Sequence, residues 1–240
     1  MKVRFLAPVA IFAAACLTVS CKNTSTVPNT LSEKESAEGW KLLFDGQSMD
    51  QWHVYNKGTI PSTWQVKNGE LHCDPESTNL RADLVTNEEF ENYDLKFEWK
   101  LAEGGNSGVF INVDEQDSIP TTWYSGPEYQ LLQDAHPDFD VPLKRPGCLY
   151  NFTPQKNFVK TKPKGEWNES RIVQKDGNIT FYLNGTVTAE MDLKSKQWQR
   201  LVKTSSFKDA PAFGKKTKGK IALQDWAHGA SFRNLKIKTL

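Results

Sequence analysis

Glu128 and Gln130 are the residues whose types and spacing best suit chemistry on a hydroxyl-rich ligand. They lie in the run Glu128 to Leu132, where Tyr129 and Leu131 alternate with polar residues. Because successive strand side chains point to opposite faces, we expect the polar pair over a concave outer surface and the apolar pair between two sheets. A carboxylate accepts hydrogen bonds and an amide donates and accepts them, which suits sugar hydroxyls. The alternative is that Glu128 is only a solvated strand residue.

The loop after this run holds Asp134, His136 and Asp138. An imidazole can take or give a proton near neutral pH, and the two carboxylates could orient it. The same three residues could hold a divalent metal, although D-x-H-x-D is a weak metal motif and loops of this composition are usually turns. No cofactor is otherwise firmly implied.

Further polar candidates lie in expected loops and strand ends. Asn106 follows a Gly-Gly pair and could offer its amide to a ligand, or bond only within its own turn. Arg145 stands in a basic pair that is normally solvent-exposed, and it could stabilise an anionic oxygen. Tyr150 could protonate a departing oxygen. Gln224 and Asp225 end another predicted strand.

Aromatic side chains could stack on sugar rings. Most of the eight tryptophans should pack in the core or against strands. Trp123 and Trp226 stand in loop-like segments and are the better candidates for stacking, with His228 close to the second of them.

The elements that must position these residues are strands. Apolar and charged residues alternate from Tyr93 to Leu101, which predicts one buried and one solvated face. Tight hairpins are predicted at Asn68-Gly69, Asp176-Gly177 and Asn184-Gly185, which accept positive φ angles. Further strands are expected at 40–44, 107–113, 148–151, 220–224 and 231–238, and short helices at 87–92 and around 198–202. The pattern predicts an all-β fold, a two-sheet antiparallel β-sandwich or jelly roll with one or two short helices.

The first residues resemble a secretory leader. Lys2 and Arg4 precede an apolar run over 5–19, which is too short to span a bilayer comfortably. Cys21 is the expected lipidation site, with Cys16 as its rival and cleavage to a soluble secreted form as the alternative. We therefore expect a signal peptide over 1–20, a flexible tether over 21–38 and a single domain over 39–240, held at the cell envelope.

The net charge and the cysteines limit which binding partners and cross-links can be expected. The chain carries a formal net charge of +1, and loss of residues 1–20 with their two cations leaves 220 residues at −1. No overall basic field is present to attract nucleic acid, and membrane contact is expected through the lipid anchor only. Cys73 and Cys148 lack metal-site spacing and could pair in an oxidising compartment or stay free.

Six ordered segments carry a family resemblance: GWKLLFDGQSMDQWHVYN at 39–56, GNSGVFI at 105–111, EYQLLQDAHPD at 128–138, PGCLYN at 146–151, GEWNESRIVQKDGNITFYLNG at 165–185 and GKIALQDWAHGASFRNLKIK at 219–238. The set resembles the bacterial 3-keto-disaccharide hydrolase family, which is similar in fold to concanavalin-like and laminarinase-type jelly rolls. Two positions depart from the family's usual pattern. Asn112 stands where members often have an arginine, and Trp226 stands where a histidine is common, although His228 could partly replace it.

The resemblance implies an enzyme that cleaves glycosides already oxidised at C3 of the sugar, often after a partner glucoside 3-dehydrogenase. The ketone makes the C2 proton removable and places the C1 substituent β to the carbonyl, so elimination or hydrolysis at C1 needs a base, enolate donors and an acid. We expect His136 or Glu128 as the C2 base, and Asp225 or Tyr150 as the acid. The expected substrate contacts are Asn106, Gln130, Asp134, Arg145, Trp123, Trp226, Gln224 and His228.

Two other classes of function remain open. A non-catalytic carbohydrate-binding envelope lipoprotein would use the same concave face without turnover. A conventional glycoside hydrolase would need two carboxylates about 5–9.5 Å apart across the scissile bond. Laminarinase-type enzymes place such acids in an E-x-D-x-x-E run, whereas Glu128 is followed at i+2 by Gln130, which argues against this chemistry.

Overall fold

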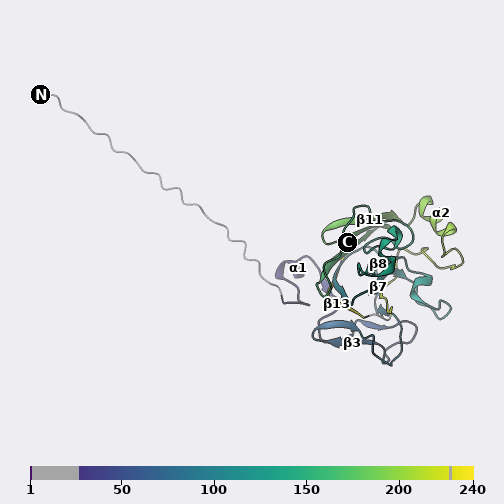
Figure 1. The fold of residues 1–240 in the computed structure, drawn as a ribbon, viewed down its shortest axis with the longest axis horizontal. Helices are drawn as coiled ribbons and strands as arrows, with labels where there is room; N and C mark the ends of the chain where they lie inside the picture. Colours follow the sequence, from purple (N-terminus) through teal and green to yellow (C-terminus); the bar gives the residue numbers. More distant parts are fainter. Residues whose placement is uncertain (2–26, 227–228) are drawn as a thin grey trace.

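Two antiparallel sheets pack face to face in the computed structural model (Figure 1). The structure describes Met1 and residues 27–226 and 229–240. The expected leader, with Cys16 and Cys21, therefore lies outside the described residues, and so does His228. The sandwich confirms the predicted all-β class.

Within the described residues the larger sheet has eight strands, in the order β11-β10-β9-β6-β13-β4-β3, with β1 beside β13. Their bounds are β1 Lys41–Leu42, β3 Trp64–Lys67, β4 Glu70–Cys73, β6 Tyr93–Leu101, β9 Asn168–Lys175, β10 Asn178–Leu183, β11 Thr186–Asp192 and β13 Ala230–Thr239. The smaller sheet, over the same part of the chain, has five strands in the order β2-β5-β12-β7-β8. These are β2 Trp52–Val54, β5 Leu84–Thr86, β7 Asn106–Val113, β8 Glu128–Leu132 and β12 Lys220–Leu223.

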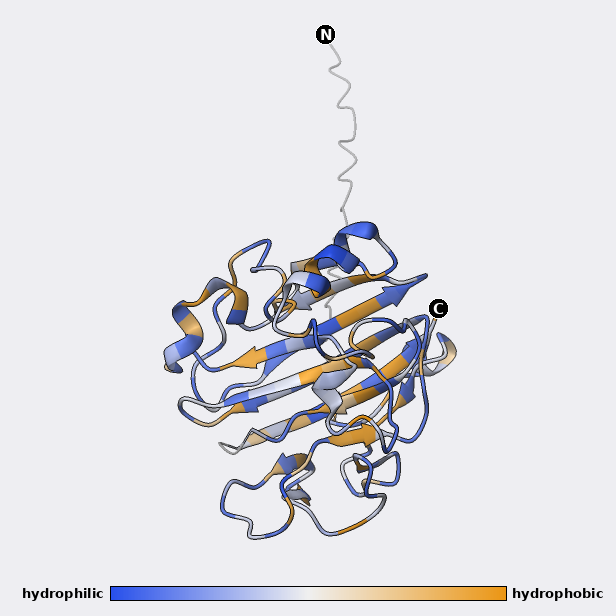
Figure 2. Cartoon of the chain, turned by 90° about the vertical axis from the view of Figure 1, so that its right-hand side faces the viewer, coloured by the Kyte–Doolittle hydropathy of each residue, from blue (hydrophilic) through white to orange (hydrophobic). Residues whose placement is uncertain are grey.

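The alternation in β6 explains how the core forms. Leu95, Phe97 and Trp99 are buried between the sheets, whereas Lys96 and Lys100 lie half-exposed on the outer face. Figure 2 shows similar alternation of apolar and polar residues along the strands. Because burial of each large apolar side chain contributes about 1.5–3 kcal/mol, this row fixes which face of the strand turns inward.

The three predicted hairpin turns are present. Each has positive φ at both central residues: 54° and 76° at Asn68-Gly69, 52° and 86° at Asp176-Gly177, and 47° and 82° at Asn184-Gly185. This is the geometry of type I′ turns, whose twist matches that of the flanking strands.

The segment around Tyr150 is not the strand that we expected over 148–151. Its backbone does bond to β8, since Gln130 N donates to Cys148 O at 3.2 Å and Tyr150 N donates to Glu128 O at 3.1 Å. Asn151 then adopts a φ of 63°, which turns the chain away and leaves only isolated bridges at Leu149. The short pairing is enough to hold Tyr150 beside Glu128.

The expected helix at 87–92 is also wrong, because the backbone of this segment pairs elsewhere. Asn87 N donates to Gln51 O, and Phe90 bridges Gly219. The helix α2 (Lys196–Thr204) confirms the prediction around Trp198, which is its buried residue. One further short helix, α1 (Glu33–Ala37), and three 3₁₀ turns were not predicted; the turns are η1 Thr122–Tyr124, η2 Pro137–Asp140 and η3 Pro142–Lys144.

The C-terminal part of the expected tether is docked on the domain, which corrects the flexible assignment for residues 29–38. Asn29 is 6% exposed, and its side chain donates to Gly69 O at 2.8 Å and accepts from Asn234 N at 2.8 Å. Asn29 N donates to Asn234 Oδ1. Glu35 in α1 forms an ion pair with Lys236 of β13. Polar composition misled the prediction here, because this segment is held by hydrogen bonds and not by apolar burial.

Asn29→Ala should lower the free energy of unfolding by about 1 kcal/mol, because it removes the side-chain partner of two partly buried backbone groups, Gly69 O and Asn234 N. Urea unfolding measures this change. Thr30→Ala is the matched control, since its hydroxyl bonds only to the neighbouring Val27 O in an exposed position. Equal stability of the two variants would show that the segment is not anchored through Asn29.

The sequence left the pairing of the two cysteines in the domain open. Cys73 and Cys148 are both buried free thiols, so they do not form a disulfide. Among the described residues, no helix has the length and apolar content that a membrane span requires.

Candidate active site

A hollow of about 420 Å³ opens over the outer face of β7 and β8, at the end of β12. Its size lies within the range of about 300–1,000 Å³ that is usual for small-ligand sites. Loops from 138–151 and 206–207 and two exposed tryptophans complete its wall. We call it the Glu128 hollow; it is lined by Asn106, Trp123, Glu128, Gln130, Asp138, Lys144, Tyr150, Asn151, Ser206, Phe207, Gln224 and Trp226.

Glu128 is the most unusual group in this hollow. The residue is 9% exposed, and no donor or cation in the described part of the chain is bonded to its carboxyl group. Burial raises the pKa of Glu128 well above its ordinary value, and the nearby charge of Asp83 adds to the increase. A buried carboxyl without a partner destabilises a fold, so its presence in a hollow marks a candidate for proton transfer.

Gly108 explains why this carboxyl fits. Gly108 of β7 lies opposite Gln130 of β8, two residue pairs along from the pair that Phe110 forms with Glu128. A Cβ at position 108 would overlap Glu128 Oε1 and come within 2.8 Å of Glu128 Cδ. The glycine in the GNSGVFI run is therefore required by the close approach of the glutamate side chain.

Gln130 and Asn106 form a polar pair beside the carboxyl. Gln130 Nε2 donates to Asn106 Oδ1 at 2.8 Å and to Leu131 O at 3.0 Å, and Gln130 is almost fully buried. These bonds fix the Asn106 amide with its oxygen occupied. No protein acceptor in the described chain takes the Asn106 NH₂ group, so it remains able to donate to a ligand oxygen.

Tyr150 and Lys144 bring a phenol and an ammonium to the same hollow. Burial, and then the charge of Glu128, raise the pKa of the Tyr150 hydroxyl, so it stays protonated near neutral pH. Lys144 Nζ forms an ion pair with Asp138 Oδ2 at 3.0 Å, and that bond raises the pKa of Lys144. The hollow thus contains a base candidate, an acid candidate and a fixed cation.

The rim is aromatic. Trp123 and Trp226 are 41% and 54% exposed, as stacking platforms require. Trp123 packs against Phe207 with ring centroids 6.3 Å apart. Ser206 and Phe207 were not predicted, because they follow α2 in a loop whose sequence has no motif; only the tertiary fold brings them here.

Asp83 is a further residue that sequence analysis missed. Its carboxylate accepts from Thr122 Oγ1 and, at 2.9 Å, from Asp225 N. Thr122 directly precedes Trp123, and Asp225 directly precedes Trp226. The Asp83 carboxylate therefore links the two segments that carry the tryptophans of the rim. Burial raises the pKa of Asp83 to about 6. A single acidic residue before β5 gave no signal in the sequence.

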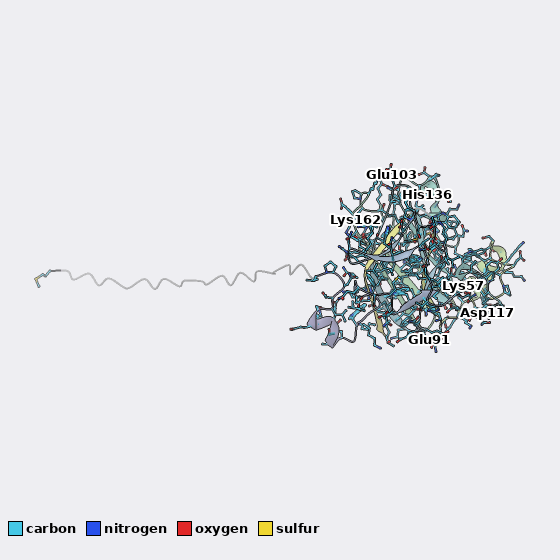
Figure 3. The ribbon with its side chains drawn as sticks, turned by 90° about the horizontal axis from the view of Figure 1, so that it is seen from below. Lys57, Glu91, Glu103, Asp117, His136 and Lys162 are labelled. Carbon is cyan, nitrogen blue, oxygen red and sulfur yellow. The ribbon has the colours of Figure 1, made fainter. Side chains whose placement is uncertain are left out.

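His136, in the loop over 134–138, does not line the Glu128 hollow. His136 Nδ1 accepts from Asp138 N at 3.0 Å and caps η2, and Figure 3 places His136 at the periphery of the domain. Asp134 is exposed and bonds to Gln133. The described residues contain no group of three metal-ligating side chains, so the suggested Asp134, His136 and Asp138 cluster is not formed. Only Asp138 of the three lines the hollow.

Arg145 and Asp225 are also placed differently from expectation. Arg145 Nε donates to Phe139 O at 3.1 Å, and its guanidinium lies over the Phe158 ring. The Asp225 carboxylate is fully buried, accepts from Thr63 Oγ1 at 2.6 Å and pairs with Arg81. Neither side chain lines the Glu128 hollow, whereas Gln224, whose backbone is bonded to Gly108 O, does.

The departure at Asn112 has no direct effect on the hollow. Asn112 is buried, and its amide exchanges hydrogen bonds of 2.7 and 3.0 Å with the amide of Gln174. The departure at Trp226 does matter, because this side chain lines the hollow.

Comparison with known proteins finds relatives in sequence and in structure. Residues 39–238 match the model of the 3-keto-alpha-glucoside-1,2-lyase-like domain. A 3-keto-disaccharide hydrolase of Bacteroides thetaiotaomicron is 30% identical over 231 residues, which cover 85% of this chain and 79% of that protein. Two crystal structures from Parabacteroides distasonis, described as those of glycosyl hydrolases, are also similar. The first is 32% identical with a TM-score of 0.81, and the match covers 89% of this chain and all of that one. The second is 26% identical with a TM-score of 0.64, and the match covers 84% of this chain and 99% of that one.

Proposed function

Since this chain belongs to the family of 3-keto-alpha-glucoside-1,2-lyase-like domains and is a glycoside-cleaving enzyme, we propose that it cleaves 3-keto-disaccharides with Glu128 as the C2 base. The observation that carries this proposal is the buried, unpartnered Glu128 carboxyl in a hollow that also holds Asn106 and Tyr150. A raised pKa makes a carboxylate a stronger base, which suits the removal of a proton next to a ketone.

The proposed reaction begins when the Glu128 carboxylate takes the C2 proton, and the C2–H electron pair forms an enolate with the C3 oxygen. The Asn106 amide and the Lys144 ammonium donate to that oxygen. The enolate then collapses and expels the C1 oxygen, which Tyr150 protonates. Addition of water across the resulting enone gives the hydrolysed 3-keto-sugar, whereas release of the enone gives a lyase outcome. The word lyase in the family's description favours an elimination step. The word hydrolase in the relative's name favours a hydrolysed sugar as the final product.

A pair of glycosides tests the substrate. We expect turnover of a p-nitrophenyl 3-keto-glucoside and none of the unoxidised glucoside, and turnover of the keto form should slow when C2 carries deuterium. Cleavage of the unoxidised glycoside at a similar rate would identify a conventional glycosidase, and binding of glycan without any turnover would identify a lectin-like module. Cleavage of the keto form without an isotope effect would contradict proton removal as a slow step.

A conventional glycosidase is the second candidate, because Asp83, which directly precedes β5, gives Glu128 a carboxylate neighbour. Both Asp83 oxygens are bonded within the protein, however, and the side chain does not line the hollow. It is better placed to influence Glu128 than to touch a substrate.

Asp83→Asn should move the acid limb of the kcat/KM profile to lower pH. The charge of Asp83 raises the pKa of Glu128, so its removal lets Glu128 ionise at lower pH, while the new amide oxygen can still accept from Asp225 N. The measurement is kcat/KM against pH with the 3-keto-glycoside. Asp117→Asn, which removes an exposed carboxylate, is the control and should leave the profile in place. A shift to higher pH would contradict this coupling.

Localisation and partner complete the proposal. A lipid on Cys21 would hold the enzyme at the cell envelope, and a glucoside 3-dehydrogenase would supply the C3 ketone. The leader pattern and the polar residues that follow it support the anchor. Fatty-acid labelling should be lost in Cys21→Ala and kept in Cys16→Ala, and the opposite result would move the anchor to Cys16.

A further inference from the structure

Charge is distributed very unevenly along this nearly neutral chain. Eight of its thirty Lys and Arg residues, but one of its 29 acids, lie between Lys194 and Lys218, so this segment carries +7 and the rest carries −6. Lys216 and Lys218 have acidic partners. In the described chain the other six have no ion pair, and all six are exposed: Lys194, Lys196, Arg200, Lys203, Lys208 and Lys215.

Four of these lysines surround a groove of about 550 Å³ between α2 and the loop over 205–217. We call it the lysine groove; its rim is formed by Lys194, Lys203, Lys208 and Lys215. Its inner wall includes Trp198, Val202, Pro211 and Phe213.

The groove has a rigid support. Trp198 Nε1 donates to Gly214 O at 2.8 Å, and Phe213 stacks on Phe207 with ring centroids 4.2 Å apart. Phe152 packs against both Trp198 and Phe213. The apolar wall is therefore preformed, and it fixes the backbone positions from which the rim lysines extend.

The lysine groove and the Glu128 hollow share one loop as their common wall. Ser206 and Phe207 line the hollow, and the next residue, Lys208, lines the groove. Phe207 touches Trp123 on one side and Phe213 on the other. The loop over 206–208 therefore contributes to both sites.

We propose that the lysine groove binds acidic saccharides, sugars that carry carboxylate or sulfate groups. The C–H faces of a sugar ring would pack on the apolar wall, while its anionic groups would pair with the rim ammonium groups. The concentration of unpaired cations would also raise the local concentration of such a ligand. The proposal concerns binding and does not depend on the chemistry assigned to Glu128.

The position of the groove favours a glycan over the membrane surface. Figures 1 and 3 show α2 and α1 on opposite sides of the domain, and α1 belongs to the segment through which the N-terminus joins the domain. A membrane approached from the N-terminal side would face away from the lysines.

Titration with oligogalacturonides at low salt, followed by calorimetry, tests this proposal. The triple variant Lys203→Gln, Lys208→Gln and Lys215→Gln should bind at least about tenfold more weakly than the unmodified chain, and added salt should weaken binding of the latter. Lys57→Gln, Lys67→Gln and Lys160→Gln together remove the same charge from other exposed positions and should keep the affinity within about twofold. Replacing the three groove lysines by arginine should preserve binding.

Three results would overturn the proposal: equal affinity of the groove variant and the unmodified chain, equal affinity for neutral dextran oligosaccharides, or binding only to phosphatidylglycerol vesicles. Glu128→Gln should bind oligogalacturonides normally, so failure of the groove and failure of the proposed reaction can be told apart.

Discussion

Glu128→Gln is expected to lower turnover of the 3-keto-glycoside by about 10²–10⁴-fold and, at neutral pH, to make the folded protein more stable. The activity falls because an amide of the same size cannot accept the C2 proton. The stability rises because burial raises the pKa of Glu128, so the folded state must either keep a proton or bury a charge, whereas the unfolded chain ionises freely. This cost appears as the pH rises above the ordinary carboxyl range and is absent in acid, where both states are protonated.

Urea unfolding at several pH values and steady-state kinetics measure the two effects. The stability gain should shrink toward pH 4, since the unfolded glutamate is then protonated as well. Glu76→Gln is the control, because Glu76 is exposed and should change neither property appreciably. Normal turnover in the Glu128 variant would exclude the base role, and lost turnover without a gain in stability at neutral pH would contradict the raised pKa.

Gly108→Ala should reduce kcat by about 10²-fold or more, although it adds only a methyl group to a residue that performs no chemistry. The new Cβ would overlap Glu128 Oε1, so the carboxyl must leave its position over the hollow. Misplacing a catalytic group by about 1 Å can cost about 10²-fold in rate, and overpacking a buried site costs about 1–3 kcal/mol of stability.

A double-mutant cycle separates this displacement from general damage to the fold. Glu128→Ala removes the overlap, so stability lost in Gly108→Ala should largely return in the double variant, and the two effects should be strongly non-additive. Simple additivity of the unfolding free energies would show that the methyl group acts elsewhere. The kinetic measurement uses the same 3-keto-glycoside.

The fold and one half of the site could be predicted from local patterns. Strand alternation placed Glu128 and Gln130 on one face and Tyr129 in the core, because the two-residue period of a strand is independent of its neighbours. The positions of Asn106, Tyr150 and the two exposed tryptophans also agree with the predicted hollow. The catalytic and binding roles of all these residues remain predictions.

The wrongly predicted site residues are those whose positions depend on tertiary contacts. His136 lies near Glu128 in sequence, yet its ring is used to cap a turn, a choice that spacing cannot reveal. Asp225 follows a pocket residue but turns toward Thr63 and Arg81. Asp83 and Phe207 reach the site from segments without any motif. Long-range packing, and not local propensity, sets these positions.

The backbone pairing between Cys148–Tyr150 and β8 has a consequence for solubility. β8 is the last strand of the smaller sheet, and an uncovered outer strand offers free amide and carbonyl groups to other chains. The Leu149 segment occupies some of those groups. We therefore expect the contact that holds Tyr150 beside Glu128 also to shield the sheet from self-association, so that damage to this loop lowers the proposed activity and promotes aggregation.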